Sequence, residues 1–298
     1  MKIISGLRNS ILTLITAISI SACNLTSTKP TTPATPAKPQ AVIGLALGGG
    51  VSKGFAHIGV IKVLQENHIP VRIVTGTSAG ALVGSMYASG MSPDRLELEA
   101  EILNKADLVD PVLSTSGFIK GQKLQDYINN KVRNKPMQQF PIRFGAVATE
   151  FGTGRMAVFT NGNAGLAVRA SASIPNIFQP AVIGNKRFVD GGLVAPVPVT
   201  AAKQLGANVV IAVDISAKPA TLTSTGFFSY FDQSLNIMSS SALNSELSKA
   251  QVVIRPQVQK LGTIGGFDQK AQAIKLGEDA ARAALPQIRA VLSKYQVN

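Results

Sequence analysis

The chain has 298 residues, 45% of them hydrophobic, with 29 basic and 16 acidic side chains and a formal net charge of +13. This length and composition exclude a disordered protein and allow a large buried core. The single cysteine excludes an internal disulfide, and basic residues that are scattered singly, without interleaved aromatic residues, argue against a nucleic-acid partner. The sequence contains no cluster of metal-ligating residues, and we expect neither a metal nor a cofactor.

The first 23 residues have the pattern of an exported lipoprotein. Lys2 and Arg8 precede an apolar run from Ile11 to Ile20, which is too short for a comfortable membrane span. The Ile-Ser-Ala-Cys that ends this region resembles the bacterial lipobox, which implies a signal peptide at residues 1–22, cleavage before Cys23 and lipidation of its thiol. Asn24 implies the periplasmic face of the outer membrane under enterobacterial sorting. The alternative is an export signal without lipidation.

Residues 23–40 are rich in Thr and Pro and contain almost no apolar side chains. Such a stretch cannot pack, so we expect an extended tether that joins Cys23 to a folded domain at residues 41–298. Removal of residues 1–22 leaves 27 basic and 16 acidic side chains, a formal charge of +11. A positive domain on a lipid tether should be attracted to anionic headgroups, and less strongly as salt increases.

The folded domain begins with a buried strand, a glycine loop and a helix. Ala41 to Leu47 is a continuous apolar run of the kind found in parallel sheets, and Gly48-Gly49-Gly50 follows it. Val51 to Asn67 has helical apolar spacing. A dinucleotide-binding loop would need glycine at position 53, where Lys53 stands, so that alternative fails.

The next strand leads into a candidate nucleophile. Val71 to Val74 precedes Gly-Thr-Ser-Ala-Gly and a helix of small residues, the context in which GxSxG forms a nucleophile elbow with Ser78 at its tip. We expect Gly76 and Gly80 to supply unusual backbone angles and close chain contacts. The alternative is a glycine-rich turn with a structural serine.

A serine nucleophile needs a neighbouring base. The chain has two histidines, His57 and His68, and both precede Ser78, which is the wrong order for a histidine triad of the α/β-hydrolase type. We expect both to be structural. Two aspartates follow predicted strands, Asp190 and Asp214, and their patterns alone leave the choice open.

The remaining pattern alternates helices and short strands. Two prolines should give the segment after residue 173 an extended backbone and a rigid turn, and Pro286 should kink or divide a long C-terminal helix. An aromatic cluster (Phe227, Phe228, Tyr230, Phe231) precedes a helix and is either packed core or a flap over the site. The predicted strands are 142–149, 156–160, 186–189, 207–215 and 252–254, and the predicted helices are 122–132, 164–173, 232–250 and 268–294.

Two of these stretches carry a family resemblance. LGGGVSKGFAHIGVIKVL and IVTGTSAGALVGSMYASG strongly resemble the patatin-like phospholipase family, especially its bacterial and neuropathy-target-esterase members, and the resemblance extends over residues 41–256. It implies an α/β fold of three layers, with a central, mostly parallel sheet flanked by helices. It also implies a Ser-Asp dyad, because Asp190-Gly191-Gly192 matches the family's aspartate motif. Asp190 is therefore the expected base.

The resemblance also assigns the glycine loop to the oxyanion hole. Gly49 and Gly50 match the family pattern, whereas Val51 stands where the family has a glycine when the loops are aligned on Lys53-Gly54. We therefore expect donors at Gly49 and Gly50 and leave the Val51 amide open.

These features predict a lipid-anchored serine acyl hydrolase of the bacterial cell envelope that cleaves phospholipids or lysophospholipids. Membrane lipids would be both its substrate and its surface. One alternative is a non-catalytic lipid-binding envelope lipoprotein, which the irregular Val51 favours. The other is a different serine hydrolase, such as a thioesterase or a peptidase. The sequence defines neither the oligomeric state nor the acyl-chain and headgroup preference.

Overall fold

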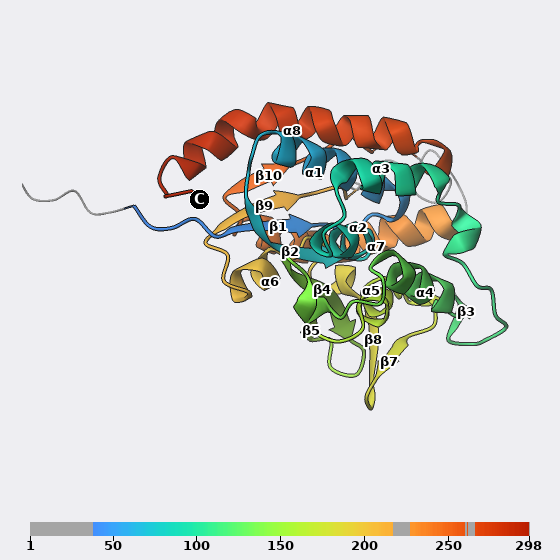
Figure 1. Cartoon of the computed structure of the whole chain (residues 1–298). Coiled ribbons are helices and arrows are strands. Elements are labelled where there is room, and N and C mark those ends of the chain that lie inside the picture. Colours follow the sequence, from blue (N-terminus) through green and yellow to red (C-terminus); the bar gives the residue numbers. More distant parts are fainter. Residues whose placement is uncertain (1–37, 217–226, 260, 262–265, 298) are drawn as a thin grey trace, which may run out of the picture. The chain divides into compact units, whose positions relative to one another are not determined.

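The computed structural model describes residues 38–216, 227–259, 261 and 266–297 (Figure 1). The predicted signal peptide, Cys23 and the tether up to residue 37 lie outside the described residues. The end of the predicted tether is part of the folded body, because the Gln296 amide donates to the Pro39 carbonyl at 2.9 Å and the Ala41 amide donates to the Gln296 carbonyl at 2.8 Å. None of the helices in the described ranges is long and apolar enough to cross a membrane.

An eight-stranded sheet forms the centre of the domain. Its strand order is β10-β9-β1-β2-β4-β8-β7, with β5 paired to β4, and the five strands from β10 to β4 are parallel. All residues of β1 and β9 are buried, as expected for strands covered on both faces. The strands are β1 (Ile43–Leu47), β2 (Val71–Thr77), β4 (Arg143–Glu150), β5 (Met156–Phe159), β7 (Ala181–Ile183), β8 (Lys186–Asp190), β9 (Val209–Val213) and β10 (Val252–Ile254).

Helices cover both faces of the sheet, which confirms the predicted three-layer α/β fold (Figure 1). Alternate side chains of β1, such as Leu45 and Leu47, enter the larger core with α1, α2, α3 and α8, whereas Ala46 faces a smaller core with α6 and α7. The helices are α1 (Ala56–Glu66), α2 (Ala79–Ala88), α3 (Pro93–Ile102), α4 (Gln122–Lys131), α5 (Ala164–Ser171), α6 (Val199–Gln204), α7 (Phe227–Leu247) and α8 (Lys270–Leu292).

Two glycines allow α1 and α8 to pack backbone against backbone. A Cβ atom on Gly59 of α1 would lie 2.0 Å from the carbonyl oxygen of Ile274, and one on Gly277 of α8 would lie 2.0 Å from that of Ala56. Any larger residue would therefore push the helices apart. The sequence predicted that Pro286 kinks or divides α8, and the helix is not divided: it continues past the proline, where Ile288 and Leu292 are buried in the core.

A second, two-stranded sheet was not predicted. It pairs β3 (Gly117–Ile119) with β6 (Asn176–Phe178) in parallel, and these strands lie in the segments before α4 and after α5. The segment after residue 173 contains both predicted features: the Phe178 amide closes a turn by donating to the Ile174 carbonyl at 2.8 Å, and β6 is extended. The aromatic cluster falls at the start of α7, where the side chains of residues 227–232 lie outside the description.

Candidate active site

Ser78 occupies a strained turn between β2 and α2. Its backbone angles, φ 54° and ψ −119°, are unusual for a residue with a side chain and match those of a nucleophile elbow. Gly76 and Gly80 act through close contacts rather than through unusual angles of their own. A Cβ on Gly76 would lie 2.4 Å from the Gly80 carbonyl oxygen, and one on Gly80 would lie 2.1 Å from that of Leu47.

Hydrogen bonds from distant segments hold this turn. The Ser78 amide donates to the Ser171 hydroxyl at 3.0 Å, and that hydroxyl donates to the Val147 carbonyl at 2.5 Å. The Thr77 hydroxyl donates to the Ala195 carbonyl at 2.8 Å. Nothing in the sequence pattern had singled out Ser171 as a supporting residue. Because α5 and β4 both contribute, the orientation of Ser78 depends on the assembled sheet and helices.

Asp190 ends β8, and its carboxyl lines the same cavity as Ser78. Its Oδ1 accepts the Gly192 amide at 2.7 Å, whereas its Oδ2 is buried with no partner of regular hydrogen-bond geometry among the described residues. Burial raises the pKa of Asp190 to about 6, and the Gly192 amide and the Ser78 side chain oppose this rise. Gly191 lets the motif approach β4, since a Cβ there would lie 2.2 Å from the Val147 carbonyl oxygen.

The other candidate bases lie elsewhere. Asp214 accepts the Ser216 amide and hydroxyl at 3.0 and 2.6 Å and lies 3.4 Å from Arg255 Nε. Asp214 lines neither of the two cavities that Ser78 lines, although its partner Ser216 lines one of them. His57 is buried behind the glycine loop, where its Nε2 donates to the Gly48 carbonyl at 2.8 Å. Burial lowers the pKa of His57 to about 4, so it is neutral. His68 is exposed, as expected. Of the two aspartates that the sequence left open, Asp190 is the one beside Ser78.

Two small cavities meet at Ser78. The polar cavity, so named because it contains the Asp190 carboxyl, has a volume of about 100 Å³; Gly49, Gly50 and Gly192 also line it, and much of its remaining wall is apolar. The apolar cavity, of about 130 Å³, is lined mainly by hydrophobic side chains, including Leu103, Leu108 and Phe178. Ser78 and Val51 line both. A carbonyl carbon at Ser78 would therefore have an apolar space on one side and the carboxyl on the other.

The glycine loop differs in one respect from the expected oxyanion hole. The Gly49 amide donates to the Pro196 carbonyl at 3.0 Å, so it is not available as the donor that we expected. The Gly50 and Val51 amides, in contrast, donate no hydrogen bond to any of the described residues. Gly49 contributes through its size instead, because a Cβ there would lie 3.3 Å from Ser78 Cβ.

Val51 adopts a conformation that a β-branched residue rarely takes. Its φ is 52°, in the left-handed region that favours glycine, and its side chain is partly exposed between the two cavities. The residues after it fit the motif more closely. Lys53 is buried, and Gly54 lets the loop pack on α2, since a Cβ there would lie 2.6 Å from Ala79 Cβ. Val51 thus takes, at a φ of 52°, the backbone conformation that a glycine would take without strain.

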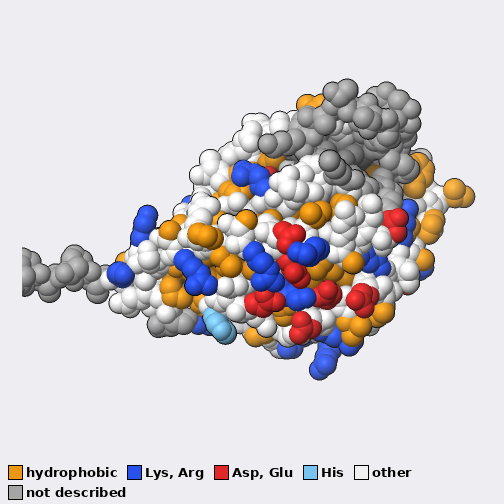
Figure 2. Space-filling view, turned by 90° about the horizontal axis from the view of Figure 1, so that it is seen from above, with side chains coloured by type: hydrophobic (Ala, Val, Ile, Leu, Met, Phe, Trp, Pro, Cys, Tyr) orange, Lys and Arg blue, Asp and Glu red, His pale blue; other side chains and the backbone are white. Residues whose placement is uncertain are grey.

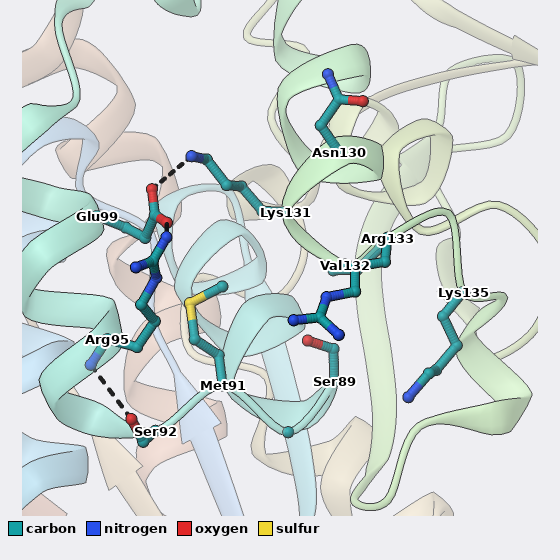
Figure 3. Close-up of a pocket in the computed structure, with 11 residues that line it drawn as sticks. Ser89, Met91, Ser92, Arg95, Glu99, Asn130, Lys131, Val132, Arg133 and Lys135 are labelled. Carbon is teal, nitrogen blue, oxygen red and sulfur yellow. Dashed lines mark hydrogen bonds and ion pairs between the residues drawn. The ribbon is translucent and has the colours of Figure 1, made fainter.

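A larger cavity, of about 770 Å³, lies at the other end of α2 (Figure 3). Arg95 and Lys131 both bind the buried carboxylate of Glu99, at 2.6 and 2.5 Å, and Arg133 and Lys135 also line the cavity. Because α2 has ten residues, this cavity is about 15 Å from Ser78, and Ser78 is not part of its lining. No group of three His, Cys, Asp or Glu side chains in the described ranges is arranged to hold a metal ion.

Comparison with known proteins agrees with this geometry. The sequence profile of patatin-like phospholipases matches residues 45–203, which include the glycine loop, Ser78 and Asp190. The chain belongs to the patatin-like phospholipase family. An uncharacterised NTE family protein of Mycobacterium tuberculosis is 32% identical over 180 residues, covering 60% of this chain and 50% of that protein. Lysophospholipase NTE1 of Mycosarcoma maydis is 33% identical over 193 residues, covering 59% of this chain and 10% of that protein.

Solved structures share the fold of this patatin-like protein at low identity. VipD from Legionella pneumophila has a TM-score of 0.60 and 14% identity, with 87% of this chain and 72% of that chain covered. The type III effector protein ExoU has a TM-score of 0.50 and 16% identity, with 84% and 54% covered. The chain spans half or less of the length of the curated relatives named above.

Proposed function

We propose that the protein is a serine acyl hydrolase that cleaves fatty-acyl esters of phospholipids or lysophospholipids through Ser78 and Asp190. The observation that carries this proposal is the position of Ser78, at the junction of an apolar cavity and a polar cavity that contains the Asp190 carboxyl. The lysophospholipase named among its relatives supports the same substrate class.

In the proposed reaction, the Asp190 carboxylate accepts the Ser78 hydroxyl proton as the serine oxygen attacks the ester carbonyl. The amides of Gly50 and Val51 stabilise the oxyanion, a role we no longer give to Gly49 because its amide is occupied. Asp190 then donates the proton to the leaving alcohol. Water, deprotonated by Asp190, cleaves the acyl-enzyme and restores both residues. The apolar cavity holds the acyl chain.

The experiment that tests this function is hydrolysis of phosphatidylcholine and lysophosphatidylcholine by the purified protein, with the products identified by mass. Release of fatty acid should disappear in Ser78→Ala and Asp190→Asn and persist in Asp214→Asn, the matched control for a buried aspartate outside the site. A fluorophosphonate probe should label the parent protein at Ser78. Failure to label would favour the non-catalytic lipid-binding alternative, and faster turnover of thioesters or peptides would favour another serine hydrolase.

The membrane anchor is a separate proposal that depends on the first 23 residues. The lipobox-like Ile-Ser-Ala-Cys supports lipidation of Cys23 and attachment to the bacterial cell envelope, at the periplasmic face of the outer membrane. Cys23→Ser should abolish incorporation of radiolabelled palmitate and release a soluble or uncleaved form. Unchanged labelling and fractionation would contradict the anchor and leave the hydrolase proposal intact.

A further inference from the structure

One short segment, residues 102–120, both lines the apolar cavity and exposes large hydrophobic side chains to solvent. Leu103 and Leu108 point inward and line the cavity beside Ser78. Ile102, Leu113 and Phe118 are 58%, 100% and 63% exposed. Side chains of this size usually avoid such exposure when they are close together, so their position beside the cavity indicates a binding surface.

The exposure of these side chains is built into the fold, because hydrogen bonds fix the backbone on each side of them. The Asp110 carboxylate accepts the amides of Gly121, Gln122 and Lys123 at 2.7 to 3.1 Å. The Val112 amide donates to the Phe118 carbonyl at 2.8 Å, which closes the loop that carries Leu113 at its tip. The β3 strand pairs with β6, where Phe178 joins the cavity wall. The loop is therefore held by backbone hydrogen bonds in a shape that leaves Leu113 fully exposed.

The segment projects from the end of the domain where the parallel strands terminate, on the right in Figure 1. Figure 2 shows several hydrophobic side chains at that same end, and others spread over the face of α1, α3 and α8, where acidic and basic side chains are mixed. Ser78 follows β2, so it lies toward this end too. The exposed side chains and the entrance to the apolar cavity thus lie on one side of the molecule.

We propose that residues 102–120 dock on a lipid surface, with Leu113 and Phe118 inserted among the acyl chains. This proposal rests on the proposed acyl hydrolase function. The occupant is lipid because the same segment forms the cavity wall, so a docked bilayer would cover the cavity and an acyl chain would reach Ser78 without crossing water. The segment should bind lipid through its apolar side chains, because its charges balance. Its two acidic residues, whose carboxylates accept backbone amides, offset its two basic residues (Asp107, Asp110, Lys105 and Lys120).

Tryptophan fluorescence provides a direct test because the natural sequence contains no tryptophan. Phe118→Trp in the full chain should show a blue-shifted emission with phosphatidylcholine vesicles and quenching by brominated phosphatidylcholine. Val297→Trp is the control, since Val297 is 42% exposed beside Gln296, which pairs with Gln40 just before β1, at the opposite end of the parallel strands. The proposal is overturned if the emission of Phe118→Trp does not change with lipid, or if it shifts with protein concentration alone, which would indicate a second copy as the occupant.

Activity on two substrate forms separates docking from chemistry. Leu113→Ser and Phe118→Ser should each lower turnover of phosphatidylcholine vesicles about tenfold, as expected for loss of one buried apolar side chain, and at high salt as much as at low salt. Turnover of a soluble short-chain ester should not change. Val297→Ser, at a valine 42% exposed beside Gln296, is the control and should behave like the parent.

The two tests also distinguish the two proposals. Lipid quenching of the tryptophan in Phe118→Trp, without any esterase activity in the parent protein, would support docking and contradict the hydrolase function. Full esterase activity on both substrates in Leu113→Ser and Phe118→Ser, without lipid quenching in Phe118→Trp, would contradict docking and leave the hydrolase function standing.

Discussion

Two buried ionisable groups, His57 behind the glycine loop and Asp190 beside Ser78, differ in what surrounds them. Each has one buried atom without a partner among the described residues, His57 Nδ1 and Asp190 Oδ2, and burial shifts the pKa of each toward the neutral form. Asp190 lines a cavity with Ser78, whereas His57 lines neither cavity and holds the Gly48 carbonyl. A shifted pKa alone therefore indicates only that a group is buried. A role in catalysis is indicated when the group also lines a cavity with the candidate nucleophile.

The largest effect should come from breaking the dyad. Ser78→Ala and Asp190→Asn should each reduce kcat/KM by about a thousandfold or more, because the nucleophile and its base act as one unit. For the same reason the double variant should be little worse than either single one. Steady-state kinetics on a soluble ester would measure this. Near-parent activity in Asp190→Asn, with loss in Asp214→Asn or His57→Gln, would contradict the mechanism.

The pH dependence of stability should show the two groups acting in opposite directions. Asp190 favours folding below pH 4, and this contribution is lost as the pH rises to about 6, because the unfolded chain ionises first. His57 favours folding above its unfolded pKa of about 6.5, and this contribution is lost as the pH falls to about 4. Each pKa shift corresponds to about 3 kcal/mol of unfolding free energy. Because the two contributions change with pH in opposite directions, they nearly cancel between pH 4 and 6.

Substitution should separate the two contributions in denaturant unfolding at pH 4 to 8. Relative to the parent, Asp190→Asn should lose stability as the pH falls below 6, and His57→Gln should gain it. Parallel curves for all three proteins would contradict the assignment. For activity, kcat/KM should rise with pH to a plateau above about 6, since the base must be ionised.

A smaller effect is expected when His57 loses its hydrogen bond. His57→Leu leaves the Gly48 carbonyl without its donor and should cost about 1–3 kcal/mol of unfolding free energy. His57→Gln can still donate and should cost less. In both variants, activity should fall only as far as the fraction of folded protein falls. Calorimetry would give the folded fraction at one temperature, and kinetics at the same temperature would give the activity. A loss of activity in fully folded His57→Gln would show that His57 does more than support the loop.

The smallest effect concerns Val51. Val51→Gly should raise the free energy of unfolding by about 1 kcal/mol, because glycine takes a φ of 52° without strain. Val51→Ala removes the branched methyl groups but keeps a Cβ, so it should not be stabilised. Chemical denaturation of the two variants provides the comparison, and equal gains in both would show that crowding, not backbone strain, is the cost at this position.

The sequence was sufficient to predict elements that depend on local pattern. The apolar runs of β1, β2 and β9 and the GxSxG turn identified the parallel sheet and Ser78, because buried strands and sharp turns restrict residue type. The β3–β6 pair was missed, since three-residue strands carry no measurable alternation. The α3 helix was also missed, although Ser92 and Pro93 are suitable start signals.

Contacts between distant segments could not be predicted. The bond from the Ser78 amide to Ser171 joins residues 93 apart, and the bond from Gly49 to Pro196 occupies an amide that the motif had made a donor. The left-handed conformation of Val51 was equally invisible, because a β-branched residue indicates the opposite preference. Motif matching was thus sufficient to select Ser78 and Asp190 as candidates. Which amides of the glycine loop are free to donate depends on tertiary packing, which the motif does not contain.

The close packing of α1 on α8 also has a consequence for the order of folding. The α1 helix carries His57, which supports the glycine loop, and its partner helix lies more than 200 residues later in the chain. Contacts of such long sequence separation form slowly. We therefore expect that a growing or refolding chain acquires its sheet before its glycine loop is ordered, and that reactivity toward a fluorophosphonate probe is the last native property to emerge.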